Sequence, residues 1–322
     1  MTTLYIDRKD VELRVNGGAL EFHEPNGKRG SAPLAPLERV VLRGRAHLTT
    51  SVLGAIADAG AGVLMLSGRH NRHLASCVGR PHNDVVRRLG QFDAYRDPDA
   101  RTAWSRALVL AKTRAQTRLL QGALDRRPDK RRALTRSIRQ LQATADRLSN
   151  GTPSANVATL LGMEGAAAAS YFSGYCELFP PSVEFRGRNR RPPRDPVNAC
   201  LSLAYTMLHF EAVTACHAAG LDPMLGLYHE PAHGRESLAC DVVEPLRPHV
   251  DAWVWMMFRD RVLTAEGFHD DNGAAFLGKA ARKRFYERFN PLGVALRRLL
   301  RRQLSGAAKE FAERGSGLQS NR

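Results

Sequence analysis

The sequence predicts an α+β protein with a small, mainly β N-terminal domain followed by a larger all-α C-terminal domain. Two observations predict this division. Up to residue 84, short apolar runs are separated by turn signals such as Asn16-Gly17-Gly18, which is typical of strands and hairpins. After residue 84, apolar residues recur every three or four positions, which is typical of amphipathic helices. We therefore expect a β domain over residues 1–84 and a helical domain over residues 85–305.

The expected strands of the first domain are short and are bounded by glycine, proline or asparagine. They are Thr3–Asp7, Val11–Val15, Ala19–His23, Arg39–Leu42, Gly62–Leu66 and Leu74–Val78. The segment Thr50–Gly60 interrupts them with helical spacing and ends at a glycine, which favours a helix terminus. The pattern thus predicts a β module that contains one helix.

Helical spacing dominates the second domain. The expected helical segments are Asp84–Tyr95, Ala100–Leu124, Arg132–Leu148, Asn156–Phe172, Val197–Ala218, about Ala239–Phe258, Leu277–Arg284 and Arg297–Arg302. From about residue 305 the chain is polar and ends in glycine and serine, so residues 306–322 are predicted to be a disordered tail.

The segment Ala100–Leu124 is expected to turn an alanine-rich stripe inward and a basic face outward. The inward stripe comprises Trp104, Ala107, Leu108, Ala111, Ala115, Leu119 and Ala123. The outward face comprises Arg101, Arg106, Lys112, Arg114 and Arg118. A solvated helix face usually explains such charge. Because basic segments follow one another here with few compensating acids, a phosphate-facing surface is favoured over that explanation.

The net charge of the chain also indicates which kind of partner it is expected to bind. The 322 residues include 48 Lys and Arg against 32 Asp and Glu, a formal net charge of +16, and most of the basic residues are arginine. Guanidinium groups suit phosphate oxygens, so a strongly basic globular chain indicates nucleic acid more often than an acidic membrane surface. We find no stretch of about 18 apolar residues, and therefore expect no membrane span and no membrane partner.

Cysteine usage argues against two structural classes. The five cysteines form no C-x-x-C pair, and their number is odd; they are Cys77, Cys176, Cys200, Cys216 and Cys240. Zinc ribbons and disulfide frameworks are therefore disfavoured, and reduced thiols in a cytoplasmic protein fit best. The N-terminus has no basic segment followed by an apolar run, so no signal peptide is expected.

One stretch, residues 227–247, combines a histidine with two carboxylates. His229 lies in a short glycine-containing loop before an expected helix that carries Asp241 and Glu244, three positions apart and hence on one face. Apolar residues surround both acids, so this is not an acidic solvent face. Carboxylates beside an imidazole can hold a hard divalent cation. The alternative is a helix start with acids favoured by the macrodipole and an unrelated loop histidine.

Glu164 is a second candidate, because it lies on an otherwise apolar helix face. It follows Leu160 and Leu161 by four and three positions, within the expected inward stripe of Asn156–Phe172. An acid in that position is costly unless it is paired or bound to a metal. Pairing with a buried arginine is the alternative to a metal role.

A proline-broken segment between these motifs is rich in arginine. Its candidates for phosphate contacts are Arg186, Arg188, Arg190, Arg191 and Arg194, and a later helix adds Lys279, Arg282 and Lys283. Prolines prevent regular structure in the first segment. It is either a flexible basic linker or a loop that binds substrate phosphates, and its place between the two candidate ligand regions favours the second.

Four stretches in order resemble the CRISPR-associated integrase of spacer acquisition, the first of the two universal adaptation proteins. They are 160–166 (LLGMEGA), 190–198 (RRPPRDPVN), 226–229 (GLYH) and 237–247 (SLACDVVEPLR). Each alone is modest evidence, whereas all four in this order, each with its functional residue type present, are highly specific. The resemblance extends from the N-terminal β domain to about residue 300.

The resemblance implies both a site and an assembly. Mg²⁺ or Mn²⁺ would be bound by Glu164, His229 and Glu244, with Asp241 as a further catalytic residue that is either an additional ligand or a support for one. The Gly-Leu-Tyr-His pattern favours His229 over His233 as the ligand. The β domain would serve dimerisation, and the homodimer would join a small ferredoxin-like companion in a heterohexameric complex on double-stranded and branched DNA.

The implied reaction is a transesterification. The 3′-hydroxyl of a short captured DNA attacks the edge of a CRISPR repeat, and nuclease activity is the same chemistry with water as the attacker. Three other functions are weighed against it. A non-catalytic architectural DNA-binding protein does not need the complete set of four residues. A related transposase often carries an added DNA-binding module, for which the segment after residue 305 is short. A structured RNA-binding protein leaves the inward-facing Glu164 unexplained.

Overall fold

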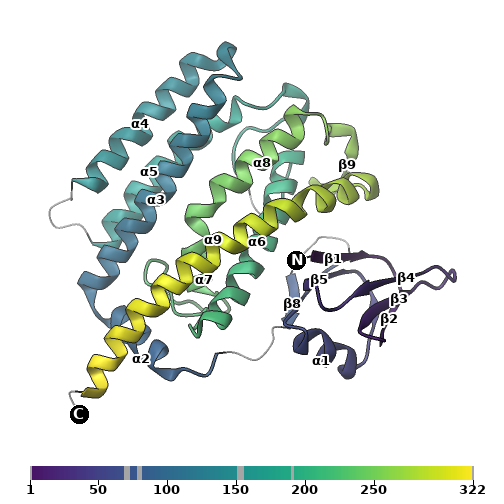
Figure 1. Cartoon of the computed structure of the whole chain (residues 1–322). Helices are drawn as coiled ribbons and strands as arrows, with labels where there is room; N and C mark the ends of the chain where they lie inside the picture. Colours follow the sequence, from purple (N-terminus) through teal and green to yellow (C-terminus); the bar gives the residue numbers. More distant parts are fainter. Residues whose placement is uncertain (1, 69–72, 78–81, 151–155, 190–191, 321–322) are drawn as a thin grey trace. The chain divides into compact units, whose positions relative to one another are not determined.

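The fold is described from a computed structural model, which defines residues 2–68, 73–77, 82–150, 156–189 and 192–320. The chain divides into two compact units, Met1–Asn83 and Asp84–Arg322 (Figure 1). The first is built mainly of strands and the second mainly of helices. The predicted fold class is therefore confirmed, and the division lies one residue from the expected boundary.

The described strands of the first unit form two four-stranded sheets. One has the order β1-β5-β7-β8, and its members are β1 (Thr2–Asp7), β5 (Leu37–Arg43), β7 (Gly62–Leu66) and β8 (His73–Cys77). The other has the order β4-β3-β2-β6, with β4 (Arg29–Pro33), β3 (Ala19–His23), β2 (Val11–Asn16) and β6 (Ala46–His47). Helix α1 (Thr50–Asp58) packs against them through Val52 and Ile56.

The hairpin expected at Asn16-Gly17-Gly18 joins β2 to β3, with Asn16 paired to Ala19. Gly17 and Gly18 have φ angles of 54° and 76°, which explains why the turn needs glycine. The sequence reading missed β4 and β6. Strand β4 has the sequence RGSAP and lies at a sheet edge, so it has neither an apolar alternation nor a second neighbour to reveal it.

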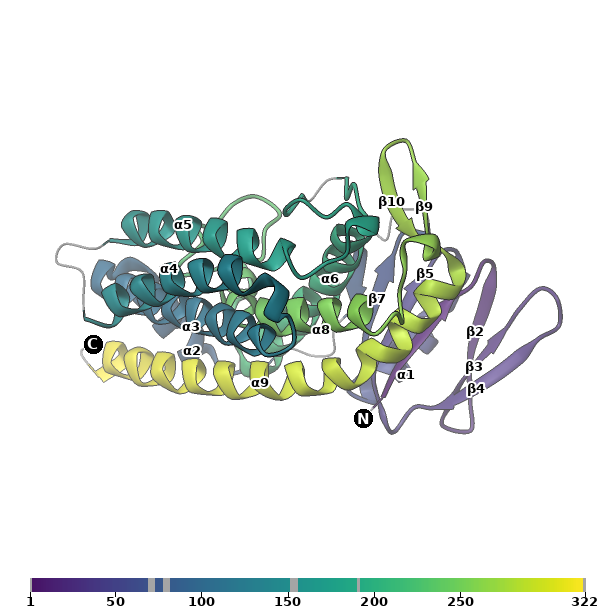
Figure 2. The ribbon, with the colours of Figure 1, turned by 90° about the horizontal axis from the view of Figure 1, so that it is seen from above.

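The helices of the second unit are α2 (Val85–Arg96), α3 (Pro98–Leu124), α4 (Arg131–Ser149), α5 (Val157–Cys176), α6 (Pro196–Ala219), α7 (Ser237–Val243), α8 (Arg247–Arg259) and α9 (Lys279–Ser320). The helix expected over about Ala239–Phe258 is divided near Pro245 into α7 and α8, and the segments expected over Leu277–Arg284 and Arg297–Arg302 both lie in α9. The other predicted helices are present with small shifts at their ends. Helices α3, α4 and α5 pack side by side (Figures 1 and 2). Short 3₁₀ turns are η1 (Pro128–Lys130), η2 (Pro181–Val183), η3 (Glu244–Leu246) and η4 (Ala265–Gly267), and β9 (Phe268–Asp271) pairs with β10 (Ala274–Leu277).

Side-chain caps set the N-termini of the helices that carry or flank the candidate residues. The carboxylate of Asp97 accepts hydrogen bonds from two backbone N–H groups at the start of α3, and Pro98 occupies the first helical position. Asn156 caps α5 by accepting from the N–H of Thr159, and Asp195 caps α6 by accepting from the N–H of Asn198. The helix expected from residue 156 does begin at the cap Asn156, whereas the helix expected from Ala100 begins earlier, at Pro98.

Helix α6 is the core helix of this unit. Among the described helices it passes the length and hydropathy test for a membrane span, yet 67% of that stretch is buried inside the unit. Val197, Cys200, Leu201, Ala204 and Leu208 are almost completely inaccessible to solvent. Burial by neighbouring helices accounts for its apolar composition.

The prediction of a disordered tail over residues 306–322 is wrong, because α9 continues without a break to Ser320. Figure 2 shows α9 running the length of the helical unit. A Cβ added at Gly315 would lie 2.2 Å from the carbonyl oxygen of Val86, and one added at Gly90 would lie 1.7 Å from that of Phe311. The two glycines therefore permit a close crossing of α2 and α9, and Gly315 was mistaken for a sign of disorder.

The expected orientation of α3 is also wrong in part. Ala107 and Ala111 are exposed, whereas Lys112 is only 9% exposed and faces inward with Leu108 and Gln116. These buried residues are spaced by four, so the inward face is rotated relative to the alanine stripe. The inward face was predicted from the alanines, but the small alanine side chain occurs readily on both buried and exposed helix faces. The buried lysine indicates that acids lie opposite α3.

Candidate metal-binding site

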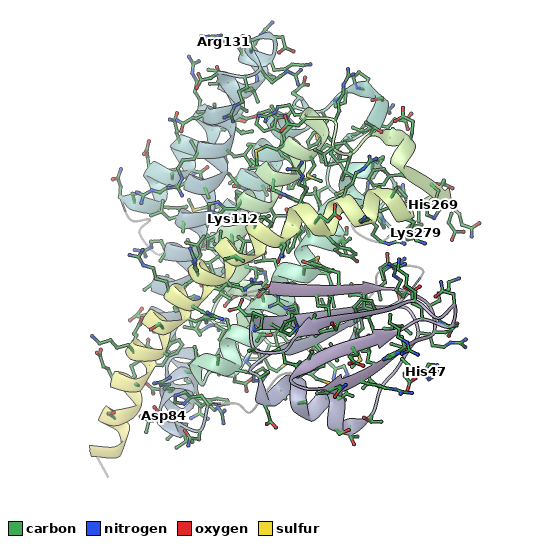
Figure 3. The ribbon with its side chains drawn as sticks, turned by 45° about the vertical axis from the view of Figure 1, so that its right-hand side comes forward. His47, Asp84, Lys112, Arg131, His269 and Lys279 are labelled. Atoms are coloured by element: carbon green, nitrogen blue, oxygen red, sulfur yellow. The ribbon has the colours of Figure 1, made fainter. Side chains whose placement is uncertain are left out.

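Three separated elements of the helical unit bring the candidate carboxylates together. Glu164 lies on α5, Glu244 begins η3, and the ammonium group of Lys112 on α3 forms ion pairs with both. Figure 3 shows Lys112 near the middle of the helical unit. Two acids that are distant in the sequence therefore contact the same ammonium group. This proximity is what a common metal site would need.

Glu244 is held from two sides. Its Oε2 contacts Lys112, and its Oε1 accepts a hydrogen bond from Nε of Arg247 at 2.7 Å. Burial by itself raises the pKa of Glu244, but Arg247, Lys112 and His229 outweigh it and lower the pKa to about 2. Glu244 is thus a carboxylate at neutral pH, which is the form that binds a cation.

Asp241 lies on α7, and Glu244 follows it three positions later, where the helix passes into η3. The carboxylate of Asp241 holds the loop that carries His229. Its oxygens accept hydrogen bonds from the backbone N–H groups of Leu227, Tyr228 and His229 at 2.8–3.0 Å. The carboxylate is completely buried and so serves as a template for that loop.

The same carboxylate fixes the imidazole of His229. Nδ1 of His229 lies 2.8 Å from Oδ1 of Asp241, which leaves Nε2 as the ring nitrogen available to a ligand. Histidines that bind metals usually donate their second nitrogen to a carboxylate in this manner. The arrangement favours the reading of Asp241 as a support for His229 over its reading as an additional ligand.

Two further contacts shape the loop around His229. A Cβ on Gly226 would lie 2.7 Å from the backbone of Ser237, so the loop can approach α7 only because residue 226 is glycine. Arg101 donates from Nε to the carbonyl oxygen of Leu227 at 3.0 Å and pairs with Glu230. Arg101, expected on the outer basic face, thus fastens the histidine loop to α3.

Tyr228 adds an unsatisfied hydroxyl to the site. Its side chain is 1% exposed, and Oη is buried without a hydrogen-bond partner in the described part of the chain. Burial raises the pKa of Tyr228, and Glu164, Glu244 and Asp241 raise it further, so the phenol remains protonated and lies near all three acids. The sequence reading missed Tyr228 and Lys112, because neither residue type is a usual ligand for a hard cation.

The donor set can accommodate a divalent ion, although it does not surround one point as the side chains lie. Within the described residues, no group of three or more His, Cys, Asp or Glu side chains is close enough to hold a metal. The positive charge between the carboxylates of Glu164 and Glu244 is that of the Lys112 ammonium group. Two carboxylates and an oriented imidazole nonetheless match the ligand preferences of Mg²⁺ and Mn²⁺.

The basic residues expected to contact DNA have different surroundings. Arg186, Arg194, Lys279 and Lys283 are exposed, while Arg282 is partly buried and donates to the carbonyl oxygen of Leu277. Arg188 bonds to Asn198 and Ser202 and lies over the ring of Tyr205. Arg190 and Arg191 lie outside the described residues. Arg188 is therefore engaged within the fold, and the exposed side chains stay candidates for phosphate contacts.

Comparison with known proteins supports the resemblance seen in the motifs. The family model described as CRISPR associated protein Cas1 matches residues 4–291. A relative from Thermodesulfovibrio yellowstonii, named CRISPR-associated endonuclease Cas1, is 37% identical over 97% of this chain and 98% of its own length.

Solved structures share the fold. A Cas1 protein from Thermotoga maritima has a TM-score of 0.80 at 20% identity, with 97% of each chain covered. A casposase bound to an integration product has a TM-score of 0.81 at 17% identity, covering 97% of this chain and 91% of its own. The matched family model, the relative's length and identity and the shared fold agree with the four motifs, and the chain belongs to the Cas1 family of CRISPR-associated endonucleases.

Proposed function

We propose that this protein is a divalent-metal-dependent DNA endonuclease and integrase that joins 3′-hydroxyl ends of captured DNA to the CRISPR repeat by transesterification. The observation that carries the proposal is the convergence of Glu164 and Glu244 on one cation beside the oriented imidazole of His229. The casposase with the same fold, described as bound to an integration product, supports strand transfer as the reaction class.

Each residue has a distinct role in this proposal. Glu164, Glu244 and Nε2 of His229 would hold Mg²⁺ or Mn²⁺, which when bound neutralises charge on the scissile phosphate and lowers the pKa of the attacking hydroxyl. Asp241 keeps His229 in the orientation that exposes Nε2. Arg247 holds Oε1 of Glu244 and leaves Oε2 for the cation. The hydroxyl of Tyr228 is a neutral donor for a phosphate oxygen at the same place.

Substitution of two ligands tests the proposal directly. We expect Glu164→Ala and His229→Ala each to abolish strand transfer on a branched DNA substrate with Mn²⁺, while DNA affinity stays nearly unchanged. The matched controls are Glu177→Ala, at the end of α5, and His233→Ala, an exposed histidine of the same loop; both should keep full activity. Wild-type activity in either ligand variant would remove the proposed site.

The partners follow from the family and its solved members. Structures of this fold include a Cas1–DNA complex and an assembly that contains Cas1 and Cas2. We infer that this chain forms a homodimer, binds double-stranded and branched DNA and joins a small ferredoxin-like companion in a heterohexamer. A cytoplasmic location is part of the same proposal.

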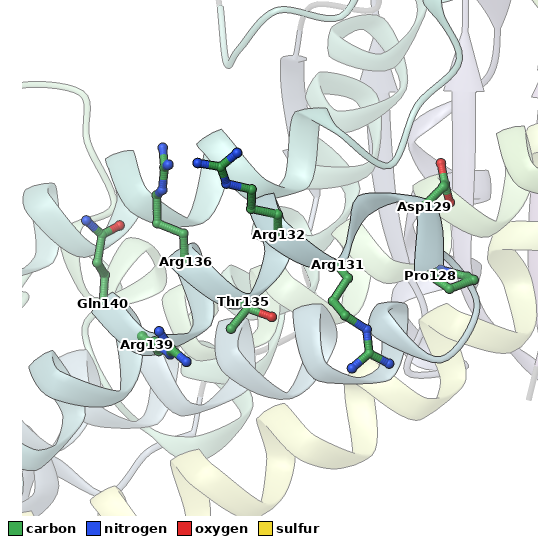
Figure 4. A pocket seen from close by; sticks show the side chains of 8 residues that line it. All are labelled: Pro128, Asp129, Arg131, Arg132, Thr135, Arg136, Arg139 and Gln140. Carbon is green, nitrogen blue, oxygen red and sulfur yellow. The ribbon is translucent and has the colours of Figure 1, made fainter.

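A groove on α4 supports contacts with the DNA backbone. Its lining, shown in Figure 4, is Pro128, Asp129, Arg131, Arg132, Thr135, Arg136, Arg139 and Gln140, and its volume is about 830 Å³. The one acid of this lining, Asp129, is already paired with Arg127 at 2.7 Å. Four exposed guanidinium groups thus face the groove without a compensating acid in its lining, an arrangement that suits phosphates along one strand.

Salt dependence tests this surface. Arg132→Gln combined with Arg136→Gln should weaken DNA binding and reduce the slope of log affinity against log salt by about 1.8, since each lost phosphate contact removes about 0.9. Fluorescence anisotropy over a range of salt concentrations measures the slope. The double variant Arg298→Gln/Arg302→Gln, at exposed positions of α9, is the charge-matched control. An equal loss of slope in both pairs would show that only net charge matters.

A further inference from the structure

Lys112 is the one basic residue of α3 whose ammonium group lies between two candidate metal ligands. Its side chain is 11% exposed, and its partners come from two other elements, Glu164 on α5 and Glu244 on η3. The ammonium group lies between the two carboxylates and contacts one oxygen of each. This buried lysine, at a core-facing position of α3, therefore offsets negative charge on both acids.

The contacts identify which atoms this cation occupies. Lys112 contacts Oε2 of Glu244, whereas Arg247 takes Oε1, and it contacts Oε1 of Glu164. Because Arg247 already donates to Oε1 of Glu244, Oε2 is the oxygen that a metal ion ligated by Glu244 would use. Lys112 and a metal ion at Oε2 would bring two positive charges to one atom, and their repulsion would make them compete.

The charges explain why a cation must be present at all times. Two carboxylates brought together from α5 and η3 repel each other in a partly dehydrated space, and an unpaired buried acid is costly. A bound divalent ion would remove that repulsion. In its absence only Lys112 bridges the two acids within the described residues, and Arg247 reaches Glu244 alone.

From these contacts we propose that Lys112 is an internal counter-cation. It holds Glu164 and Glu244 in position before the metal binds, and it releases Oε2 of Glu244 when the metal arrives. The inference rests on the proposed metal site. Its consequence is that metal affinity is reduced by the displacement of Lys112, in exchange for a folded and prearranged site without metal.

A second consequence concerns DNA. The displaced ammonium remains tethered to α3 beside the metal, where a phosphate of bound DNA can pair with it. DNA should then favour metal binding by giving Lys112 a new partner, and by reciprocity the metal should favour DNA. The site would load its metal most readily when its substrate is present.

Calorimetric titration of the purified full-length protein with Mn²⁺ tests the inference. Lys112→Met removes the competing charge, so we expect Mn²⁺ to bind about tenfold tighter or more than to the wild type. Without metal, the same variant should have a lower Tm, and saturating Mn²⁺ should restore it. Lys112→Arg keeps the charge and should stay near the wild-type affinity. Lys130→Met, which removes an ion pair with Glu177 elsewhere in this unit, should leave Mn²⁺ affinity unchanged.

Opposite results would overturn the inference. If Lys112→Met binds Mn²⁺ as weakly as the wild type or more weakly, Lys112 does not compete with the metal. If that variant does not fold, a structure of the wild-type protein with Mn²⁺ decides: Nζ is expected more than about 4 Å from Oε2 of Glu244. Retention of both ion pairs beside the bound metal would contradict the displacement.

One variant separates the two proposals. The double substitution Glu164→Gln/Glu244→Gln should eliminate Mn²⁺ binding if the proposed metal site is right. Wild-type Mn²⁺ affinity in that variant would refute the metal site itself. Loss of binding there, combined with no gain in Lys112→Met, would keep the metal site and reject the role of Lys112.

Discussion

Glu244 and Asp251 are both buried acids of the helical unit, and they are surrounded by different kinds of partner. Glu244 is 7% exposed and contacts two cations, Lys112 and Arg247. Asp251 is 2% exposed and accepts hydrogen bonds from the hydroxyl groups of Tyr171, at 2.7 Å, and Tyr205. Burial raises the pKa of each acid, but the final pKa is about 2 for Glu244 and about 6 for Asp251.

The difference separates two uses of a buried carboxylate. Hydrogen bonds from the hydroxyl groups of Tyr205 and Tyr171 lower the pKa of Asp251, and Arg247 and Arg188 lower it further, but together they do not offset the effect of burial. Cations offset that effect for Glu244, and a cation can be exchanged for another. Asp251 therefore joins α5, α6 and α8 as a structural connection, while Glu244 is suited to bind a metal.

Arg247 lies between the two acids. Its guanidinium pairs with Glu244 and stacks over the ring of Tyr205 at 4.5 Å, and Tyr205 in turn donates to Asp251. The orientation of the candidate ligand Glu244 is thus supported by the hydrogen-bond network around Asp251. This connection allows the two acids to be compared by matched substitutions.

The largest expected difference is in strand transfer. Glu244→Gln should lower the initial rate with Mn²⁺ by about a thousandfold, since it removes a charged ligand from the proposed metal site. Asp251→Asn should stay within about threefold of the wild type, because it acts only through Tyr205 and Arg247. Rates on a branched DNA substrate measure both. Equal losses in the two variants would mean that Asp251 belongs to the reaction machinery.

Stability should show the reverse order. Asp251→Ala leaves the hydroxyl groups of Tyr171 and Tyr205 buried without their acceptor, so we expect a loss of about 3 kcal/mol in the free energy of unfolding. Glu244→Gln should lose about 1 kcal/mol, because Lys112 keeps Glu164 as a partner. Urea unfolding at pH 7 gives both values. A larger loss in Glu244→Gln would contradict the contrast drawn between the two acids.

The smallest effect is in the pH dependence of stability, and its sign differs between the acids. Burial raises the pKa of Asp251 from 3.8 to about 6. The stabilisation that comes from this shift is fully present below pH 3.8 and is lost as the pH rises through about 6. The pKa of Glu244 is lowered from 4.5 to about 2, so its contribution is present above 4.5 and is lost as pH falls through about 2.

Between pH 5 and pH 7, the stability of the wild type relative to Asp251→Asn should therefore fall by about 1 kcal/mol. The stability relative to Glu244→Gln should be nearly constant over that range, since both relevant pKa values lie below it. Urea titrations at several pH values provide the test. A rise with pH in the first comparison would show that the Asp251 carboxylate is favoured by its surroundings.

The fold class, the family and the candidate ligands were readable from the sequence for local reasons. Apolar spacing reports helices and strands, and the helical segment expected from residue 156 begins at the cap Asn156. Glu164 was recognisable because an acid on an apolar helix face needs a partner. His229 and Glu244 were found through motifs whose residue types are tied to their chemistry.

Other features depended on neighbours that are distant along the chain. Gly315 resembles a flexible tail until α2 is seen to pass within contact of α9. The sequence leaves Asp241 open as an additional ligand or as a support for one, and only the structure shows that its oxygens accept hydrogen bonds from three backbone N–H groups and lie against the imidazole of His229. Neither the close crossing of two helices nor the hydrogen-bond partners of a buried carboxylate produce a repeating pattern in the sequence.

The sequence by itself determined that this chain has a β unit and a helical unit, that it belongs to a DNA-processing family, and which acids and histidine are candidate ligands. Only the tertiary structure decided that Lys112 lies between Glu164 and Glu244, and that Asp241 holds the His229 loop. The physical reason is that secondary structure follows the spacing of residues within a few turns. Ion pairs and hydrogen bonds follow proximity in space, which α3, α5 and η3 create only when they pack together.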